Sequence, residues 1–419
     1  MDPPDSGDQY GSVPLNALTR RTLLACTLVS KPFHHGARLA LLADVKMTSW
    51  TALRRISSLC SIINSEPYLS RYIRRLHIVL DEEDAYINRL GTLFAMLEQE
   101  GVNLRQLTLE CCYCRRTPLI PVTFALIDRS LRASLLRLGE CSSLTTLHLK
   151  ALDISVVSLT RFRHLKTLII DGCTFRPRLL EDHNSEQNIF DTLDTLQIIH
   201  CLDALIELLL SESNGRSLLE NCFSRLKTLH CVFTETSDIR NLWSLLTVFG
   251  AGNSLENLEL TEVATLHLSV PSSVERFDMS RFKALRTFRL NSRIAEFRGR
   301  LNGSTAHFLL MPPLLCGPSS LEAVDIVIED APVHWMSPGP VRDGWTSLDE
   351  HLSDASRYPL LRNARLTVHV ISDTILTGEQ DPYAVKRQMW SGVHFKTLKT
   401  STNVVQESDT ILADFLGQW

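Results

Sequence analysis

The densest group of potential metal ligands in the sequence is three cysteines within four residues. Cys111, Cys112 and Cys114 directly follow a short apolar run that we expect to be a strand. A structural zinc site needs four ligands, which usually come as two spaced pairs. No second Cys or His pair follows at that spacing, since the next cysteine, Cys141, stands alone. The sequence therefore predicts neither a metal site nor a cofactor.

The sequence contains none of the common catalytic or nucleotide-binding motifs. Glycine-rich phosphate-binding loops, the H-E-x-x-H motif of metalloproteases and the G-x-S-x-G nucleophile elbow are all absent. Four of the scattered histidines lie within or beside strand patterns, where we expect solvated side chains: His77, His148, His230 and His267. We therefore predict no catalytic residues and a protein that is not an enzyme, with an unrecognised active site as the alternative.

The composition is that of an ordinary soluble protein with enough apolar residues for a large core. The chain has 419 residues, of which 44% are hydrophobic and 21% charged, and its net charge is −4. No apolar run approaches the roughly 18 residues that span a bilayer, and the first residues do not resemble a secretory signal. The eleven cysteines predict buried thiols in a reducing compartment. We expect a cytoplasmic or nuclear protein that binds neither nucleic acid nor membranes.

A short pattern, Leu-x-x-Leu-x-Leu, recurs along the chain and organises it. The three clearest copies begin at Leu144, Leu165 and Leu255. Seven related copies begin at Ile73, Leu104, Leu193, Leu226, Leu285, Leu321 and Leu361. In an extended strand, the last two apolar residues of a copy point to the same face. One strand cannot bury that face alone, but stacked neighbours bury a continuous core. The pattern therefore predicts ten stacked strands.

The chain between the copies predicts helices. Successive copies begin 21 to 40 residues apart, whereas a regular leucine-rich repeat takes about 20 to 29 residues. Asp203 and Asp238 are candidate N-caps, and Gly250 and Gly252 fit a helix stop. Segments with apolar residues at helical spacing span residues 33–42, 86–97, 203–210 and 238–249. The prediction is an α/β protein in which strand, turn and helix repeat.

The N-terminal part resembles the second half of an F-box. The matching positions hold Cys26, Leu28, Val29, Ser30, Lys31, Phe33, Ala37, Arg38, Leu41 and Val45. Residues 69–78 are similar to the first repeat that usually follows in fungal F-box-like proteins with degenerate leucine-rich repeats. The Leu-Pro signature and first helix that open the family's F-box have no recognisable counterpart in residues 13–18.

The resemblance implies a leucine-rich-repeat-like solenoid, with parallel strands on a concave face, helices outside and an N-terminal helical F-box-like cap. It also implies a Skp1-like adaptor of a cullin–RING ubiquitin ligase as a partner. The adaptor-binding residues that the resemblance implies are Leu24, Leu28, Val29, Lys31, Pro32, Phe33, Arg38 and Leu41. The alternative role of this segment is to cover the apolar end of the solenoid.

We divide the chain into four parts. These are a disordered tail (1–17), a partial F-box-like helical segment (18–47), a degenerate leucine-rich-repeat solenoid (48–380) and a C-terminal cap (381–419). The tail is polar and rich in Pro and Gly, which is typical of disorder. A short strand is predicted at residues 45–47.

The side chains that the leucine pattern leaves outward predict a partner-binding face. Its residues are His148, Lys166, Ile169, Gln197, Lys227, His230, Asn257 and Glu259. We predict a protein–protein interaction module, the substrate-recruiting F-box-type subunit of a Skp1–cullin–F-box ubiquitin ligase. Such a subunit would hold an unknown target protein near a catalytic site borne by a partner. The alternative is a leucine-rich-repeat scaffold or binding protein without adaptor binding.

Overall fold

The structure is a computed structural model, and its chain divides into two compact units, Met1–Lys150 (unit 1) and Ala151–Trp419 (unit 2). The residues that it describes are 22, 25, 31–47, 52–80, 84–98, 102–111, 122–123, 129–155, 159, 162–176, 192–212, 223–233, 236–248, 250–262, 282–293, 320–332, 346, 348–371 and 399–405.

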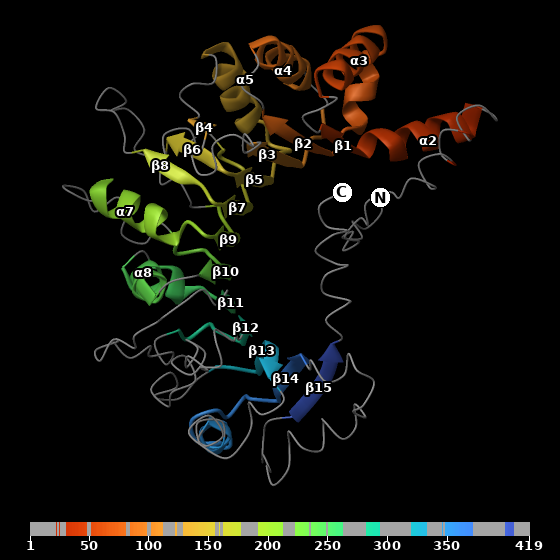
Figure 1. Cartoon of the computed structure of the whole chain (residues 1–419). Helices are drawn as coiled ribbons and strands as arrows, with labels where there is room; N and C mark the ends of the chain where they lie inside the picture. Colours follow the sequence, from red (N-terminus) through yellow and green to blue (C-terminus); the bar gives the residue numbers. More distant parts are fainter. Residues whose placement is uncertain are drawn as a thin grey trace, which may run out of the picture. The chain divides into compact units, whose positions relative to one another are not determined.

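Unit 1 contains a parallel sheet in the order β1-β2-β3-β5. Its strands are β1 (Asp44–Met47), β2 (Arg75–Leu80), β3 (Gln106–Cys111) and β5 (Thr146–Lys150). A short strand β4 (Val122–Thr123) lies between β3 and β5 in the chain and does not belong to this sheet. The helices are α2 (Lys31–Ala43), α3 (Ala52–Ser65), α4 (Asp84–Leu97), α5 (Arg129–Gly139) and the 3₁₀ helix η2 (Pro67–Tyr72). Helix α4 packs between α3 and α5, all three on one side of these strands (Figure 1).

Unit 2 contains a longer parallel sheet in the order β7-β9-β10-β11-β12-β13-β14-β15. The strands are β7 (Thr167–Asp171), β9 (Thr195–Ile199), β10 (Thr228–Phe233), β11 (Asn257–Glu262), β12 (Thr287–Arg293), β13 (Ala323–Pro332), β14 (Asn363–Ile371) and β15 (Lys399–Val405).

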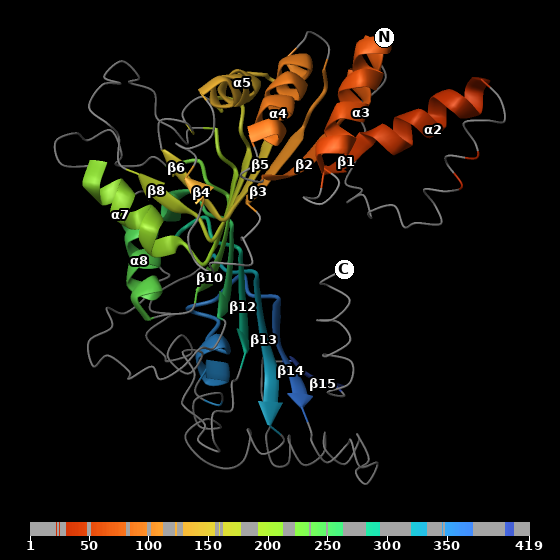
Figure 2. The same ribbon diagram turned by 45° about the horizontal axis from the view of Figure 1, so that its top comes forward.

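Strands β6 (Leu152–Ser155) and β8 (Thr174–Arg176) form a separate parallel pair. Helices α7 (Leu202–Glu212) and α8 (Thr236–Thr247) contact each other, and the 3₁₀ helix η4 (Ala251–Asn253) follows α8. Figure 2 shows β12 to β15 as successive strands from a second direction.

All ten strands that the leucine pattern predicts are present, and the α/β class is confirmed. Each strand begins two residues after the first apolar residue of its copy, as Thr146 follows Leu144 and Asn257 follows Leu255. The parallel register places equivalent positions side by side, so that Leu229 lies next to Leu258. Both are at most 1% exposed. The periodicity of two therefore sends the last two apolar residues of every copy into the core.

A forked hydrogen bond marks the start of successive strands. The carbonyl of Lys166 accepts the backbone N–H groups of both Asp194 and Thr195, each at 2.9 Å. The same fork occurs at the carbonyls of Arg74, Arg105, Lys166, Asp194, Lys227, Glu256, Arg286 and Glu322. The acceptor is the residue just before one strand, and the two donors are the last residue before the next strand and that strand's first residue. The fork therefore fixes the register of the two strands where they begin.

Four helices were predicted close to their observed positions, namely α2, α4, α7 and α8. The prediction of Asp203 and Asp238 as N-caps is wrong, because both lie inside the first turn of their helices. At Asp203 a carboxylate in the first turn still interacts favourably with the helix dipole. Helices α3 and α5 were not predicted.

Two glycines end α8 as the sequence indicated. Gly250 has a φ of 77°, a left-handed conformation that favours glycine. Gly252 is buried, and a Cβ there would collide with the ring of Phe282 and lie 2.9 Å from the Leu246 carbonyl oxygen. Glycine is therefore needed where the turn after α8 approaches the residue that leads into β12.

Three parts of the predicted organisation fall mainly outside the described residues. They are the tail at residues 1–17, the residues before α2 and most of the region 381–419. Within that last region the structure describes β15, which pairs in parallel with β14 and was not predicted. The short strand predicted at residues 45–47 is confirmed as β1. None of the helices in the described ranges combines the length and the apolar character needed to cross a bilayer.

Candidate functional site

The sheet face of unit 2 that points away from the leucine core carries mostly polar side chains in register. We call the side chains between the two core residues of each strand the middle row. In strand order the middle row is Ile169, Gln197, His230, Glu259, Arg289, Asp325 and Arg365. These side chains are half-buried or exposed, whereas their chain neighbours on both sides are buried. The row is therefore a continuous accessible surface held in place by the core beneath it.

A hydrogen-bond network joins β10, β11 and β12 at the centre of this surface. His230 Nε2 lies 3.1 Å from Thr261 Oγ1. Asn291 Nδ2 donates to Thr261 Oγ1 at 3.3 Å and to Glu259 Oε1 at 3.0 Å. Each side chain belongs to a different strand from its partner, so the network ties neighbouring strands together on the accessible side.

Arg289 extends the network to β13. Its Nε lies 3.7 Å from Glu259 Oε1 and 3.8 Å from Asp325 Oδ2, and donates to Asn291 Oδ1 at 3.2 Å. One cation thus lies between the carboxylates of the two neighbouring strands. In this part of the middle row the charges alternate in sign from strand to strand, and the side chains hold one another in place.

His230 has a pKa below its ordinary value of 6.5. Burial is the main cause, because it disfavours the charged imidazolium, and the positive charge of Arg289 acts in the same direction. Glu259 opposes this shift. At neutral pH the ring is uncharged, so it takes part in the network as a hydrogen-bonding group. The expectation of a solvated side chain is wrong for His230, because the side chains of the neighbouring strands cover part of the ring.

A second polar cluster lies on the corresponding face of unit 1. The carboxylate of Glu110 on β3 contacts His77 on β2 and Lys150 on β5. In each contact a side-chain nitrogen lies 3.0 Å from a carboxylate oxygen. The hydrogen bond from His77, followed by that from Lys150, lowers the pKa of Glu110 to about 2, against the opposing effect of burial. The solvated side chain expected for His77 is also wrong, since only 23% of it is exposed.

The predicted partner-binding residues fall in several places. Ile169, Gln197, His230 and Glu259 are successive members of the middle row. The other four predicted residues lie outside it. Asn257 occupies the outward row beside it, Lys166 and Lys227 precede β7 and β10, and His148 lies on β5 of unit 1.

The sequence analysis missed Arg289, Asp325 and Arg365. They occupy the position between the two core residues in the copies that begin at Leu285, Leu321 and Leu361. The same rule that found His230 would have found them. Thr261 and Asn291 lie two residues after Glu259 and Arg289, beyond the last leucine of the pattern. The pattern does not predict that the strands continue this far, as β11 and β12 do.

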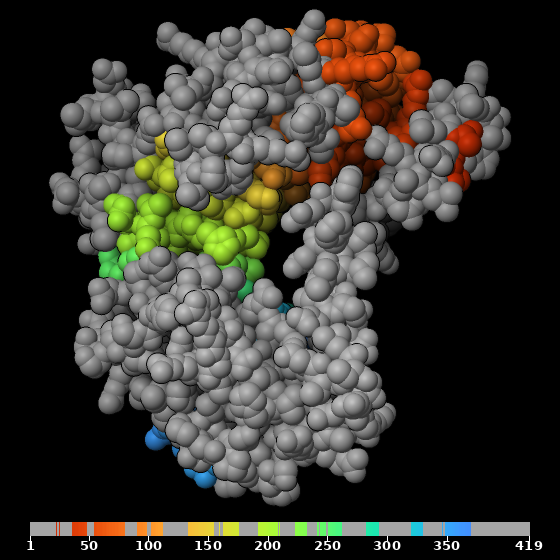
Figure 3. All heavy atoms as spheres, viewed as in Figure 1, coloured from red at the N-terminus to blue at the C-terminus, as the bar shows by residue number. Residues whose placement is uncertain are grey.

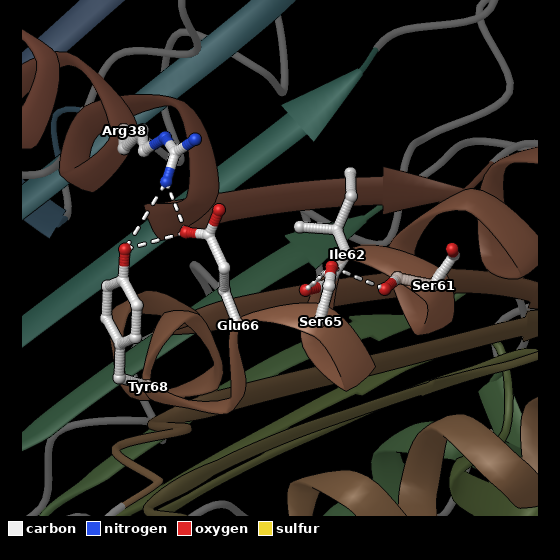
Figure 4. A network of polar contacts seen from close by, with 6 residues as sticks. All are labelled: Arg38, Ser61, Ile62, Ser65, Glu66 and Tyr68. Carbon is white, nitrogen blue, oxygen red and sulfur yellow. Dashed lines mark hydrogen bonds and ion pairs between the residues drawn. The ribbon is translucent and has the colours of Figure 1, made fainter.

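Arg38, one of the residues that the F-box resemblance implies for adaptor binding, is engaged within unit 1 (Figure 4). Its guanidinium contacts the Glu66 carboxylate and lies 3.3 Å from the Tyr68 hydroxyl. Tyr68 in turn donates to Glu66 at 2.6 Å, and this bond is the main cause of its raised pKa. The three side chains link α2 to η2, so Arg38 holds the helix against the segment that leads into β2.

The other residues of that set are described only in part. Leu41 lies on α2 and is half-buried. Leu24, Leu28 and Val29 lie outside the described residues, as do the side chains of Lys31, Pro32 and Phe33, whose backbone opens α2. Figure 3 shows the outer surface that residues around α3 contribute, in orange.

The described cysteines are mostly buried thiols, as predicted: Cys60, Cys111, Cys173, Cys201 and Cys231. Burial raises the pKa of Cys173 to about 12 and that of Cys201 to about 11. Cys112 and Cys114 lie outside the described residues. Among the described side chains, no group of three or more His, Cys, Asp or Glu is placed to hold a metal ion.

No protein-family model and no curated protein matches the sequence of this chain.

Proposed function

We propose that this chain is a protein-interaction module that binds its target through the accessible strand face of unit 2. The observation that carries this proposal is the middle row, in which seven successive strands present one outward side chain each, in register. Such a surface is wide, pre-organised and mixed in charge, properties that suit recognition of another folded surface or an extended segment.

We propose further that the repeated units form a leucine-rich-repeat-like solenoid. The fixed distance between the first leucine and its strand, the parallel register and the recurring fork at the strand starts support this architecture. Each unit contacts its neighbours through the same positions, which is how repeat proteins build a core along one axis.

We also propose that residues 18–47 recruit a Skp1-like adaptor, which would make the chain the substrate-recruiting subunit of a ubiquitin ligase. The F-box resemblance supports this role, together with the partial exposure of Leu39, Leu41 and Leu42 on α2. The bond of Arg38 to Glu66 favours the other role, a helix that caps the repeats without adaptor binding.

The binding role of the strand face is tested with two outward residues that support no other part of the structure. Arg365 is exposed and, within the part of the chain that the structure describes, has no ion pair. The double variant Arg365→Glu and Gln197→Glu reverses or adds charge at two points of the middle row. Tagged full-length chains are used to capture proteins from cells, and each specific partner is then purified and its affinity measured.

We expect at least one partner whose affinity falls about tenfold or more in the double variant, because rim and face charges control association. The matched control is Glu207→Gln on the exposed side of α7, which should bind as the unaltered chain does. If no purified partner distinguishes the double variant from the control, the strand face is not the binding surface.

A further inference from the structure

The residues whose carbonyls form the forks, which we call pre-strand residues, follow a strict charge pattern in unit 2. In strand order, together with the one before β14, they are Lys166, Asp194, Lys227, Glu256, Arg286, Glu322 and Arg362, so positive and negative charges alternate. Neighbours reach each other: Lys227 Nζ lies 3.5 Å from Asp194 Oδ1, and Arg286 Nη1 lies 3.5 Å from Glu322 Oε1. Each charge in this line therefore has an opposite charge on the neighbouring strand.

The pre-strand residues of unit 1 break this pattern. Ahead of β2 and β3 they are Arg74 and Arg105, and Thr145 precedes β5. Arg74 and Arg105 are direct neighbours, because the Arg74 carbonyl accepts the N–H of Arg105 at 2.7 Å. Both side chains are exposed, and so is that of Arg71 at the end of η2. We call these three residues the arginine cluster.

The described carboxylates near the cluster, along the chain or in the strand register, are already engaged: Glu98 pairs with Arg137, and Glu110 with His77 and Lys150. Asp44 pairs with Arg75 at 3.0 Å, and Glu66 accepts Arg38 and Tyr68. Among the described residues, Arg71 and Arg74 have no ion pair or side-chain hydrogen bond, and Arg105 donates only to Asn103, at 3.4 Å. These three exposed cations therefore have no carboxylate partner among the described residues.

Like charges on neighbouring strands repel each other, so an anion that binds between them gains more than it would at a single arginine. Adjacent strands lie about 5 Å apart, a distance over which neighbouring carboxylates of one chain segment can each meet a guanidinium. Arginine pairs with carboxylates through two parallel hydrogen bonds. The net charge of −4 on the whole chain argues against a nucleic-acid partner.

We propose that the arginine cluster of Arg71, Arg74 and Arg105 docks an acidic segment, rich in Asp or Glu, of a protein partner. This inference rests on the proposed interaction function and names a second contact of the same module. The cluster selects carboxylate-bearing partners, whereas the middle row, with its alternating charges, recognises shape and hydrogen bonding.

The test measures binding of a fluorescent hexaglutamate peptide to the full-length chain by anisotropy, at low and at physiological ionic strength. The variant is Arg74→Gln with Arg105→Gln. The matched control is Arg54→Gln with Arg55→Gln, which removes two exposed cations of α3 in the same unit. We expect the first pair to weaken binding about tenfold or more and the control to change it less than about twofold. Thermal melts verify that both variants are folded.

Equal losses in the two variants would overturn the proposal, because the effect would then be one of total charge. It would also be overturned by tighter binding of a single-stranded oligonucleotide of the same charge, or by no binding of the peptide at low salt. These results are separate from the strand-face test. Loss of a partner in the Arg365 and Gln197 variant would still support the interaction function if the arginine cluster failed.

Discussion

Glu110 shows how one side chain can join three strands. It accepts His77 from one side and Lys150 from the other, both at 3.0 Å. Its pKa of about 2 lies below the ordinary value of 4.5, so the folded protein favours the ionised carboxylate. The stabilisation is therefore complete above pH 4.5 and is lost as the pH falls from there towards 2.

We predict that Glu110→Gln lowers the free energy of unfolding by about 2 kcal/mol at neutral pH, because a half-buried charged acceptor is removed. The difference from the unaltered protein should shrink as the pH falls below 4.5, where its own carboxyl group begins to take up protons. Urea unfolding at several pH values measures this. Glu207→Gln, which is exposed on α7, should change stability by less than about 0.5 kcal/mol. A difference that is independent of pH would contradict the assignment.

For single residues, the sequence predicted to which face of the sheet a side chain points, but not which side chain it contacts. Alternation along a strand placed His77 and His230 on the outward face. It could not show that His77 meets Glu110 or that His230 meets Thr261, because each partner lies on a neighbouring strand. Those contacts depend on register between segments about 30 residues apart in the chain, as the spacing of the repeats sets it.

The pre-strand residues of unit 2 act at the scale of whole strands. Their alternating charges place an attractive pair at every step from one strand to the next. Each exposed pair is weak, but a strand paired out of order would bring like charges together. The line therefore favours the observed strand order over its alternatives.

We predict that Lys227→Glu, which creates three consecutive acidic residues with Asp194 and Glu256, destabilises the fold by about 1 kcal/mol at low salt. Salt screens exposed charges, so the loss should diminish at high ionic strength. Urea unfolding at low and high sodium chloride concentration measures both effects. Lys283→Glu makes the same charge change at an exposed residue outside the line and should have a smaller effect. If the two variants lose the same stability, neighbouring charge does not matter.

A strong apolar period predicted most elements but not all, because α3 was missed although Ile56, Leu59 and Ile63 recur at helical spacing. The ten strands follow from the leucines, and α4, α7 and α8 from helical spacing. The strand β15 has no leucine pattern, since its sequence is Lys-Thr-Ser-Thr-Asn-Val-Val. Only its β-branched residues favour a strand, and that preference is weak without a partner strand in view.

For the whole molecule, the repeats hide the division into two units. The leucine pattern continues from the copy at Leu144 to the copy at Leu165 without a change in kind. The boundary after Lys150 therefore leaves no mark in the pattern. The charges of the pre-strand residues do differ between the units. They are two arginines in succession in unit 1 and alternate in sign in unit 2, which the sequence shows once the pre-strand position is known.

The proposed adaptor binding is a property of the full chain. We predict that immobilised full-length protein retains a recombinant Skp1-like adaptor, and that Leu41→Glu reduces the retention about tenfold or more, because it places a charge on the half-buried apolar side of α2. Surface-based binding measurements at micromolar adaptor concentration test this. Arg55→Glu on exposed α3 serves as the control. Equal retention of both variants, or none by the unaltered chain, would leave α2 as a cap.

The forks at the strand starts separate two kinds of sequence change. Deleting one residue between a first leucine and its strand would move every following side chain to the other face, because the fork fixes where the strand begins. Adding residues between the end of a strand and the next first leucine disturbs no fork. Spacings of 21 to 40 residues show how widely that length already varies within this chain. Foreign peptides, epitopes or reporter sequences therefore belong in these connections, where the chain can grow while the array of strands keeps its registration.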